Sequence, residues 1–317
     1  MGNLPAKPVA PPLTEHNLPD QTGKVFLVTG ATSGIGKELG RLLYGANARV
    51  WIAARSKSKA EQTIAEIQSK APGSKGDLRT LIIDFNDLRT IKPAVEDFLA
   101  KEDRLHVLFN NAGIMIPPQG TKTVQGYEAQ LGVNNVAPFL FTKLLMPLLT
   151  HSAGLAPPGA VRVVWVSSSA VNAFAPATGV EMDNLDYHND KGQWFKYGAS
   201  KAGNVFHAAE FARRFSSSGI VNVACDPGNL DTNLYKDMPG YQRFIARTVA
   251  LKPPVFGAYT ELFCGLSTDL DVRDGWAWVV PWGKTGAVRA TVGQECKSGG
   301  VAAQFWDWSE EQVKQYL

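Results

Sequence analysis

The sequence predicts an α/β protein built on a doubly wound parallel sheet of about seven strands flanked by helices. From residue 24 onward, short runs rich in β-branched residues alternate with longer segments whose apolar residues recur three and four positions apart. This alternation is typical of repeated βα units around a buried parallel sheet. With 317 residues, 44% of them hydrophobic, the chain is long enough to bury such a core.

The expected elements follow in order along the chain. Seven short β-branched runs are expected to form strands, at residues 25–29, 49–53, 80–84, 106–110, 161–167, 221–224 and 277–280. Five longer periodic segments between them are expected to form helices, at residues 35–44, 59–69, 88–100, 127–149 and 197–215. Residues 1–20 contain five prolines and are expected to form an irregular arm before a single domain over residues 21–317.

Charge and composition exclude several classes of protein. Lys plus Arg minus Asp plus Glu is 32 − 29 = +3, with no concentrated basic region, so no nucleic-acid partner is expected. The three cysteines lie far apart and the five histidines show no metal-ligand spacing, so we expect neither a disulfide framework nor a metal site. The longest apolar stretch, 136–149, is interrupted by Pro138, Lys143 and Pro147 and is too short to span a membrane. These observations favour a cytoplasmic protein that acts on a small molecule.

A glycine-rich turn follows the first predicted strand directly. The strand VFLVT runs into Gly30, Gly34 and Gly36, spaced GxxxGxG, and a helix begins near Ile35. Glycines allow the backbone to approach a pyrophosphate, and a helix N-terminus supplies free N–H groups for it. An ordinary tight turn is the alternative.

Four further motifs follow in order, and together with the turn they resemble the short-chain dehydrogenase/reductase superfamily. They are the segments NNAG at 110–113, VSSSA at 166–170, YGASK at 197–201 and DPGNLDT at 226–232. The segments LGVNNVAPF from Leu131, DNLDY at 183–187 and FWDWSEEQ near the C-terminus are similar to the retinol-dehydrogenase-like branch and to its fungal alcohol dehydrogenases. The resemblance implies a Rossmann fold and a nicotinamide cofactor.

Tyr197 and Lys201 are the predicted catalytic pair. They lie four residues apart and therefore share one face of a helix. A nearby ammonium stabilises a phenolate and lowers the pKa of the phenol, so Tyr197 can act as general acid in ketone reduction or general base in alcohol oxidation. Without the other motifs, an ordinary surface Tyr and Lys on an amphipathic helix would be the favoured interpretation.

The resemblance implies roles for two further polar residues. Ser168 is expected to hydrogen-bond the substrate carbonyl, with Ser167 and Ser169 as neighbours that leave the assignment open by one residue. Asn134 is expected to hold a water of the proton relay, although a helix kink ahead of Pro138 explains it nearly as well.

The end of the second strand indicates which nicotinamide cofactor binds. Ala54 stands where an NAD-specific protein presents an acid to the ribose, and Arg55 and Lys57 offer positive charge to a 2′-phosphate. NADP(H) is therefore the predicted cofactor, and a solvated helix start is the alternative interpretation of the two basic residues. The resemblance adds the remaining expected contacts of the cofactor: Thr32, Ser33, Ile35, Asp84, Phe85, Asn111, Ala112, Gly113, Tyr197, Lys201, Pro227, Gly228, Leu230 and Thr232, with Asp84 as a helix cap in the alternative.

The predicted activity is that of an NADP(H)-dependent carbonyl reductase or alcohol dehydrogenase, and secondary metabolism is its expected setting. An apolar or aromatic substrate is expected, because the flanking segments contain Met115, Ile116, Phe174, Trp194, Leu234, Tyr235 and Phe244, each of which could equally be core. Residues around 230–255 are expected to form a lid over the substrate. The assembly that we expect is a homodimer. A non-catalytic NADP(H)-binding regulator and an enzyme of non-redox biosynthetic chemistry remain the competing hypotheses.

Overall fold

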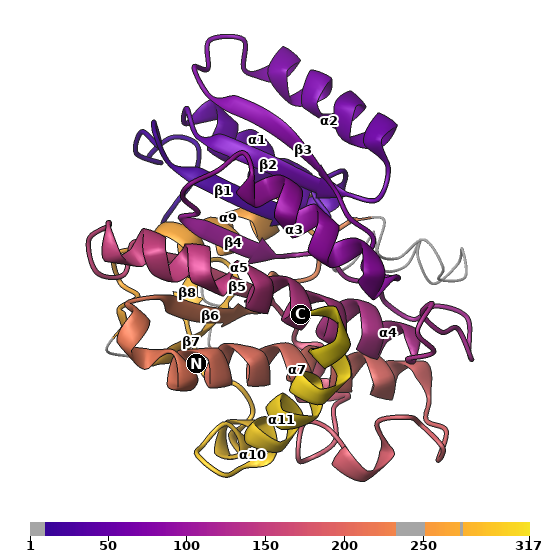
Figure 1. Ribbon diagram of the computed structural model, residues 1–317. Helices are drawn as coiled ribbons and strands as arrows, with labels where there is room; N and C mark the ends of the chain where they lie inside the picture. The colour runs from indigo at the N-terminus through magenta and orange to yellow at the C-terminus, as the bar shows by residue number, and fades with distance from the viewer. Residues whose placement is uncertain (1–9, 233–250, 273–274) are drawn as a thin grey trace.

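The structure is a computed structural model that describes residues 10–232, 251–272 and 275–317 (Figure 1). One eight-stranded sheet has the order β3-β2-β1-β4-β5-β6-β7-β8. Strands β1 to β7 pair in parallel, and β8 pairs antiparallel with β7. The strands are β1 (Val25–Thr29), β2 (Arg49–Ala54), β3 (Asp77–Ile82), β4 (Val107–Asn110), β5 (Arg162–Val166), β6 (Val221–Cys225), β7 (Trp276–Val280) and β8 (Lys284–Thr285).

Helices connect and cover these strands. The α-helices among the described residues are α1 (Gly34–Gly45), α2 (Lys57–Lys70), α3 (Ile91–Leu99), α4 (Ala129–Leu131), α5 (Ala137–Gly154), α6 (Ala170–Ala173), α7 (Gln193–Arg214), α9 (Pro254–Leu266), α10 (Ala290–Glu295) and α11 (Val301–Val313). In Figure 1, α3, α5, α7 and α11 lie in front of the sheet, and α1 and α9 lie behind it. The predicted doubly wound α/β fold is confirmed.

The alternating side chains of the strands divide the core into two layers. On β1, Val25 and Leu27 belong to the layer under α3, α5 and α7, whereas Phe26 and Val28 belong to the layer under α1, α2 and α9. Because helices cover both faces, nearly every residue of the central strands is buried, as expected for a parallel sheet. This is why the strands read as continuous apolar runs.

Two expected elements differ in the structure, and the strand β8 and the helices α9, α10 and α11 were not expected. The sheet has an eighth strand, β8, whose two exposed residues are too few to give a sequence pattern. The third strand is Asp77–Ile82 rather than 80–84, because this edge strand is half exposed and carries charged residues that pair with its neighbours. The helix expected at 127–149 consists of α4, a π-helical segment Gly132–Val136, and α5.

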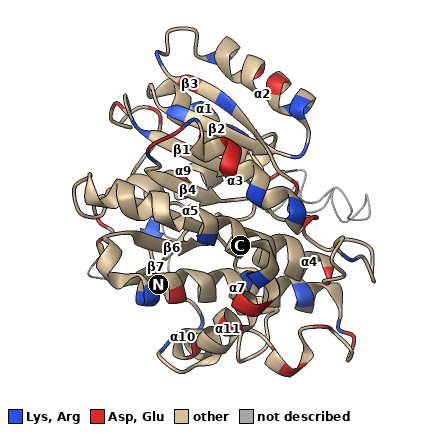
Figure 2. Cartoon of the chain, viewed as in Figure 1, with Lys and Arg blue, Asp and Glu red and all other residues tan. Residues whose placement is uncertain are grey.

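Residues 10–20 contain no strand or helix, and two of them join the packed core. Leu13 and Leu18 contact the layer under α1 and α9. Glu15 accepts a hydrogen bond of 2.5 Å from the hydroxyl of Tyr259 on α9. The positions of Lys and Arg are interspersed with those of Asp and Glu along the ribbon in Figure 2.

Candidate active site

A cavity of about 320 Å³ lies at the carboxyl ends of the central strands. Ligands of open parallel sheets bind at this edge, where loops from several strands converge. The wall of the cavity combines residues from the segments after β1, β4, β5 and β6 with the first turns of α7. They are Ile35, Asn111, Gly113, Met115, Val166, Ser167, Ser168, Ser169, Ala170, Ala173, Phe174, Trp194, Tyr197, Lys201, Pro227, Gly228, Asn229, Leu230 and Thr232.

The turn after β1 needs glycine at its three predicted positions. Gly30 and Gly34 have φ values of +67° and +56°, which are left-handed and favour glycine. A Cβ atom on Gly36 would lie 2.5 Å from the Asn111 side-chain nitrogen and 2.9 Å from the Gly30 carbonyl. The turn is therefore packed too tightly for any other residue, and it leads directly into the N-terminus of α1.

The segment after β4 is fixed against this turn by hydrogen bonds. The Asn111 side chain donates to the carbonyl of Thr29 at 2.6 Å, and the backbone N–H of Ala112 donates to the Thr29 hydroxyl at 2.9 Å. Thr232 approaches from the other side, because a Cβ on Gly34 would lie 3.2 Å from its methyl group. These contacts bring three of the sequence motifs together around one backbone turn.

Tyr197 and Lys201 lie side by side on α7 and both line the cavity. Tyr197 is 4% exposed, and its ring is 5.7 Å from the Lys201 ammonium nitrogen. Lys201 donates a hydrogen bond of 3.0 Å to the carbonyl of Val166, the last residue of β5. The ammonium is thus held between strand and helix, next to the tyrosine ring.

The three serines after β5 have different environments. The Ser167 hydroxyl is buried and donates to the Lys201 carbonyl at 2.7 Å. Ser168 is half-buried, lines the cavity, and accepts from the Ala170 N–H at 3.2 Å. Ser169 is exposed. Because the Ser167 hydroxyl is committed to α7, Ser168 keeps its place as the predicted partner of a substrate oxygen.

Asn134 lies in the π-helical segment and does not line the cavity. Its side-chain oxygen accepts from the Ile114 N–H at 2.9 Å, and its nitrogen donates to the Ile114 carbonyl and the Ser200 hydroxyl, each at 3.0 Å. The side chain thereby holds the segment after β4 against α7. A water held in a proton relay by this residue stays a prediction.

The residues expected around the adenosine half of the cofactor lie outside the cavity wall. Arg55 is exposed directly after β2, and no hydrogen bond or ion pair joins its guanidinium to another residue of the described ranges. Lys57 forms a loose ion pair with Glu61 at 3.9 Å. Asp84 does not end β3, which stops at Ile82; it accepts from the Asn86 N–H at 3.0 Å in the following loop. Phe85 is buried in the core.

The predicted residues therefore fall into two groups. Those that meet at the cavity are Ile35, Asn111, Gly113, Ser168, Tyr197, Lys201, Pro227, Gly228, Leu230 and Thr232. Those that do not line it are Gly30, Thr32, Ser33, Gly34, Gly36, Arg55, Lys57, Asp84, Phe85, Ala112 and Asn134. Of the latter, the turn residues and Ala112 support the wall from behind.

Glu261 is a further ionisable residue that interacts with Lys201, and no sequence motif singled it out. It lies on α9 with no exposed surface, and neither carboxylate oxygen has a hydrogen-bond partner among the described residues. Burial raises the pKa of Glu261 to about 8, and the Lys201 ammonium opposes that rise. Burial likewise lowers the pKa of Lys201 to about 8, against the attraction of Cys225 and Glu261.

Most of the predicted lid lies outside the described residues. Leu234, Tyr235 and Phe244 are among the residues that are not described. The two described ends of this segment are joined. The Asp231 N–H donates to the Lys252 carbonyl, and the Lys252 N–H donates to the Asn229 carbonyl, each at 2.9 Å.

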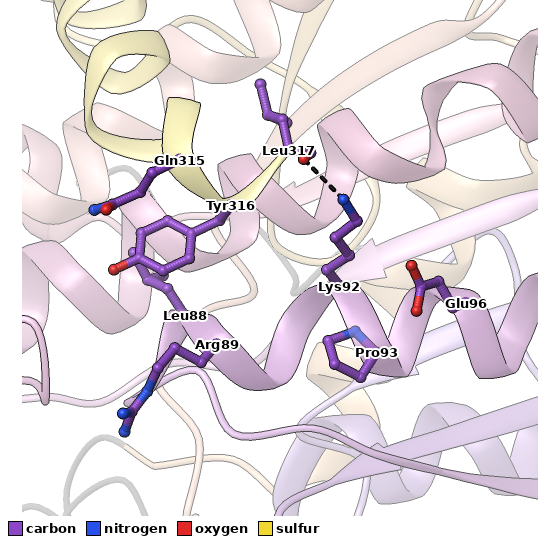
Figure 3. Close-up of a pocket in the computed structure, with 8 residues that line it drawn as sticks. All are labelled: Leu88, Arg89, Lys92, Pro93, Glu96, Gln315, Tyr316 and Leu317. Atoms are coloured by element: carbon purple, nitrogen blue, oxygen red, sulfur yellow. Dashed lines mark hydrogen bonds between the residues drawn. The ribbon is translucent and has the colours of Figure 1, made fainter.

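A second depression, of about 310 Å³, lies between α3 and the C-terminus (Figure 3). Lys92 donates there to the backbone oxygen of Leu317 at 2.9 Å. None of the residues predicted to be functional lines it. Within the described ranges, no three His, Cys, Asp or Glu side chains are grouped to hold a metal ion.

A doubly wound sheet with a glycine-rich first turn and a cavity at its carboxyl edge defines a Rossmann-type protein. A family model described as short chain dehydrogenase matches residues 24–180. A short-chain dehydrogenase/reductase of Phomopsis amygdali is 50% identical over 98% of this chain and 95% of its own length. The short-chain dehydrogenase/reductase pkfC of Emericella nidulans is 48% identical over 97% of this chain and 98% of its own length.

Solved structures agree with the fold. A crystal structure of an uncharacterised protein from Mycobacterium paratuberculosis has a TM-score of 0.69 and 27% identity, and the match covers 95% of this chain and 97% of that one. A 3-ketoacyl-(acyl-carrier-protein) reductase from Brucella melitensis, complexed with NADH, has a TM-score of 0.61 and 24% identity over 83% of this chain and 98% of that one. The chain belongs to the short-chain dehydrogenase/reductase family, a family of NAD(P)(H)-dependent oxidoreductases.

One continuous helical stretch, Ala129–Gly154, is long and apolar enough to cross a membrane by composition. Two thirds of its most apolar window, 67%, is buried inside the protein. This is the pattern of a core helix, and it accounts for the apolar run noted in the sequence.

Proposed function

We propose that this protein is an NADP(H)-dependent carbonyl reductase or alcohol dehydrogenase acting on an apolar or aromatic ketone, aldehyde or secondary alcohol. The observation that carries the proposal is the position of Tyr197 in the cavity wall, with the buried Lys201 ammonium on one side and Ser168 nearby. These three side chains together offer a proton donor, a charge that favours its phenolate, and a hydroxyl for a substrate oxygen.

The described residues fit a dinucleotide on two grounds. Gly30 and Gly36 leave no space for a Cβ atom and Gly34 has a left-handed φ, so the turn needs glycine at these three positions, and such a glycine-rich turn lets the backbone approach a pyrophosphate. The first turn of α1 contains no acidic residue, and the Ser33 side chain does not cap it. The N–H groups there are consequently available to an anion.

A bound nicotinamide would supply hydride transfer, and the residues of this chain would supply the rest. In the direction of reduction, Tyr197 donates its phenolic proton to the carbonyl oxygen of the substrate. Ser168 donates a hydrogen bond to the same oxygen and fixes its orientation. Lys201 stabilises the resulting phenolate until solvent returns the proton. Oxidation of an alcohol runs through the same groups in reverse.

The test is a panel of ketones, aldehydes and alcohols assayed by absorbance at the nicotinamide band. We expect stoichiometric consumption of NADPH with at least one carbonyl compound. If the protein binds NADPH and transforms a substrate but consumes no NADPH, it carries out non-redox chemistry instead. A protein that binds NADPH and transforms nothing would be a regulator. We propose that the protein is located in the cytoplasm, which suits its free cysteines. We also propose that it forms a homodimer, and light scattering would test that assembly.

Cofactor preference yields a separate prediction. Arg55→Ala should weaken NADP(H) binding roughly ten- to a hundredfold, because a charge-assisted hydrogen bond to a phosphate contributes about 1.5–3 kcal/mol. NAD(H) affinity should hardly change, because NAD(H) lacks the 2′-phosphate. Ala54→Asp combined with Arg55→Ala should shift the preference further, since a carboxylate repels that phosphate and accepts from a ribose hydroxyl.

Fluorescence titrations of the wild-type protein and of Arg55→Ala, each with NADP(H) and with NAD(H), measure the four affinities to be compared. Lys70→Ala, which removes a positive charge at the other end of α2, is the matched control. Equal weakening of NAD(H) and NADP(H) by Arg55→Ala would contradict the assignment, as would equal affinities of the wild-type protein for the two cofactors.

A further inference from the structure

Two large aromatic side chains stand exposed at the cavity beside Tyr197. Phe174 is 42% exposed and Trp194 is 38% exposed, and both line the cavity. Their ring centroids are 4.9 Å apart with 33° between the planes, and the Trp194 ring meets the Tyr197 ring edge-on at 6.3 Å. Phe174 and Trp194, here called the aromatic wall, thus form one continuous ring surface that ends at the predicted proton donor.

The backbone around the aromatic wall is held in place at both ends. A Cβ atom on Gly198 would lie 2.6 Å from the carbonyl carbon of Phe174 and 2.5 Å from the nitrogen of Ala175, so the end of α6 packs directly on α7. Arg289 donates to the carbonyls of Asn172, at 3.3 Å, and Ala175, at 3.1 Å. The two rings therefore stay exposed on a fixed scaffold, which is the arrangement of a binding surface.

The rest of the cavity limits the chemistry of an occupant. Below the aromatic wall, Met115, Ala170 and Tyr197 form a small buried apolar cluster. Among the described residues of the cavity wall, Lys201 is the single ionisable group besides Tyr197, and no carboxylate is present. A cationic substrate would find no counter-charge there, and burying an unpaired charge is costly. The lining therefore disfavours a cationic occupant, and the exposed rings favour one with a flat apolar body.

We propose that the aromatic wall is the specificity determinant of the site, and that it selects carbonyl compounds whose carbonyl is attached to a planar aromatic ring. The ring packs against Trp194 and Phe174, and the carbonyl oxygen then reaches Tyr197 and Ser168. This inference rests on the proposed function and names its substrate class. Planar rings make stacked or edge-on contacts with aromatic side chains that a puckered ring cannot reproduce.

A matched pair of ketones tests the proposal. Acetophenone and cyclohexyl methyl ketone share their carbon skeleton and their methyl ketone, and only the first has a planar ring. We expect the wild-type protein to have the higher kcat/KM for acetophenone. In Trp194→Leu and in Phe174→Leu, the ratio of the two kcat/KM values should fall roughly two- to tenfold, the size of a typical aromatic contact. The change should reside mainly in KM, because stacking is equally present before and during the reaction.

Phe195→Leu is the control variant. Phe195 follows Trp194 on α7 and lies 5.0 Å from the Lys191 ammonium, and it does not line the cavity. Its replacement should leave the ratio at the wild-type value. Equal losses for both ketones in Trp194→Leu, or the same fall in the ratio in Phe195→Leu, would overturn the proposal.

A binding measurement separates this proposal from the proposed function. If the protein reduces neither ketone, the oxidoreductase assignment fails for these substrates, but the aromatic wall is still testable. Saturation-transfer NMR on the protein with NADP⁺ should show acetophenone bound in preference to cyclohexyl methyl ketone, and Trp194→Leu should abolish that preference. Equal signals from the two ketones in the wild-type protein would refute the role of the aromatic wall.

Discussion

Turnover should fall roughly 10²–10⁴-fold in Tyr197→Phe, because positioned acid–base catalysis contributes about that factor. The substitution removes only the phenolic hydroxyl. The ring, which packs with Met115 and Ala170, is retained, so folding and NADPH affinity should match the wild-type protein. Steady-state kinetics on the best ketone of the panel and a fluorescence titration with NADPH measure the two quantities.

Tyr127→Phe is the matched control for the loss of a hydroxyl. The Tyr127 hydroxyl donates to Gln312 at 3.0 Å, and the residue does not line the cavity. Its removal should leave turnover at the wild-type level. A Tyr197→Phe enzyme within about threefold of wild type would mean that the proton comes from another group, and Tyr197 would then be part of the cavity wall only.

The sheet and the centre of the site could be predicted because their sequence signals are local. Parallel strands covered on both faces must be apolar throughout, and β5 and β6 accordingly appear as short β-branched runs. The glycine turn is equally visible, since left-handed φ values at Gly30 and Gly34 restrict those positions to glycine. Helical spacing places Tyr197 and Lys201 on one face of a helix, whereas their predicted catalytic role depends on the other motifs and the family resemblance.

The errors occur where packing, and not local sequence, decides the structure. The edge strand β3 is half exposed and exchanges ion pairs with β2, so its charged start looked like a loop, and Asp84 was placed on a strand that ends at Ile82. The aromatic wall consists of residues that could equally have been core. Its exposure depends on how α6 packs against Gly198, which is a contact between separate elements.

Glu261 shows the same limit most clearly. It is the single charged residue in α9, and a lone Glu in an apolar helix is ordinarily placed on the solvent side. Gly257 and Gly265, one turn before and one turn after it, contact Leu230 and Phe109 so closely that this face of α9 must lie against the sheet. Glu261 therefore lies inside the protein. In the sequence, the single indication of this burial is the nearly continuous apolar character of residues 254–266.

The buried Glu261 should make the protein less stable as the pH rises. Burial raises its pKa from the usual 4.5 to about 8 in the folded protein, so the folded state retains a proton that the unfolded state has already released. Stability is lost wherever the folded state binds more protons, which here is the window from about pH 4.5 to about pH 8. Over that window the loss attributable to this group is roughly 3 to 5 kcal/mol.

Glu261→Gln keeps the shape of the side chain and removes its ionisation. The difference in unfolding free energy between variant and wild type, from urea unfolding without cofactor, should therefore grow in favour of the variant from about pH 5 to about pH 8. In Lys201→Met, the loss of stability caused by Glu261 should extend to higher pH, because the ammonium that opposes the rise in the pKa of Glu261 is gone. Glu102→Gln is the contrasting control: the Glu102 carboxylate is also buried but accepts hydrogen bonds from Arg49, Trp51 and Arg79, so its replacement should destabilise the protein. An equal pH dependence of the unfolding free energy in wild type and Glu261→Gln across this window would contradict the prediction. It would mean that the Glu261 carboxyl does not have a raised pKa in the folded protein.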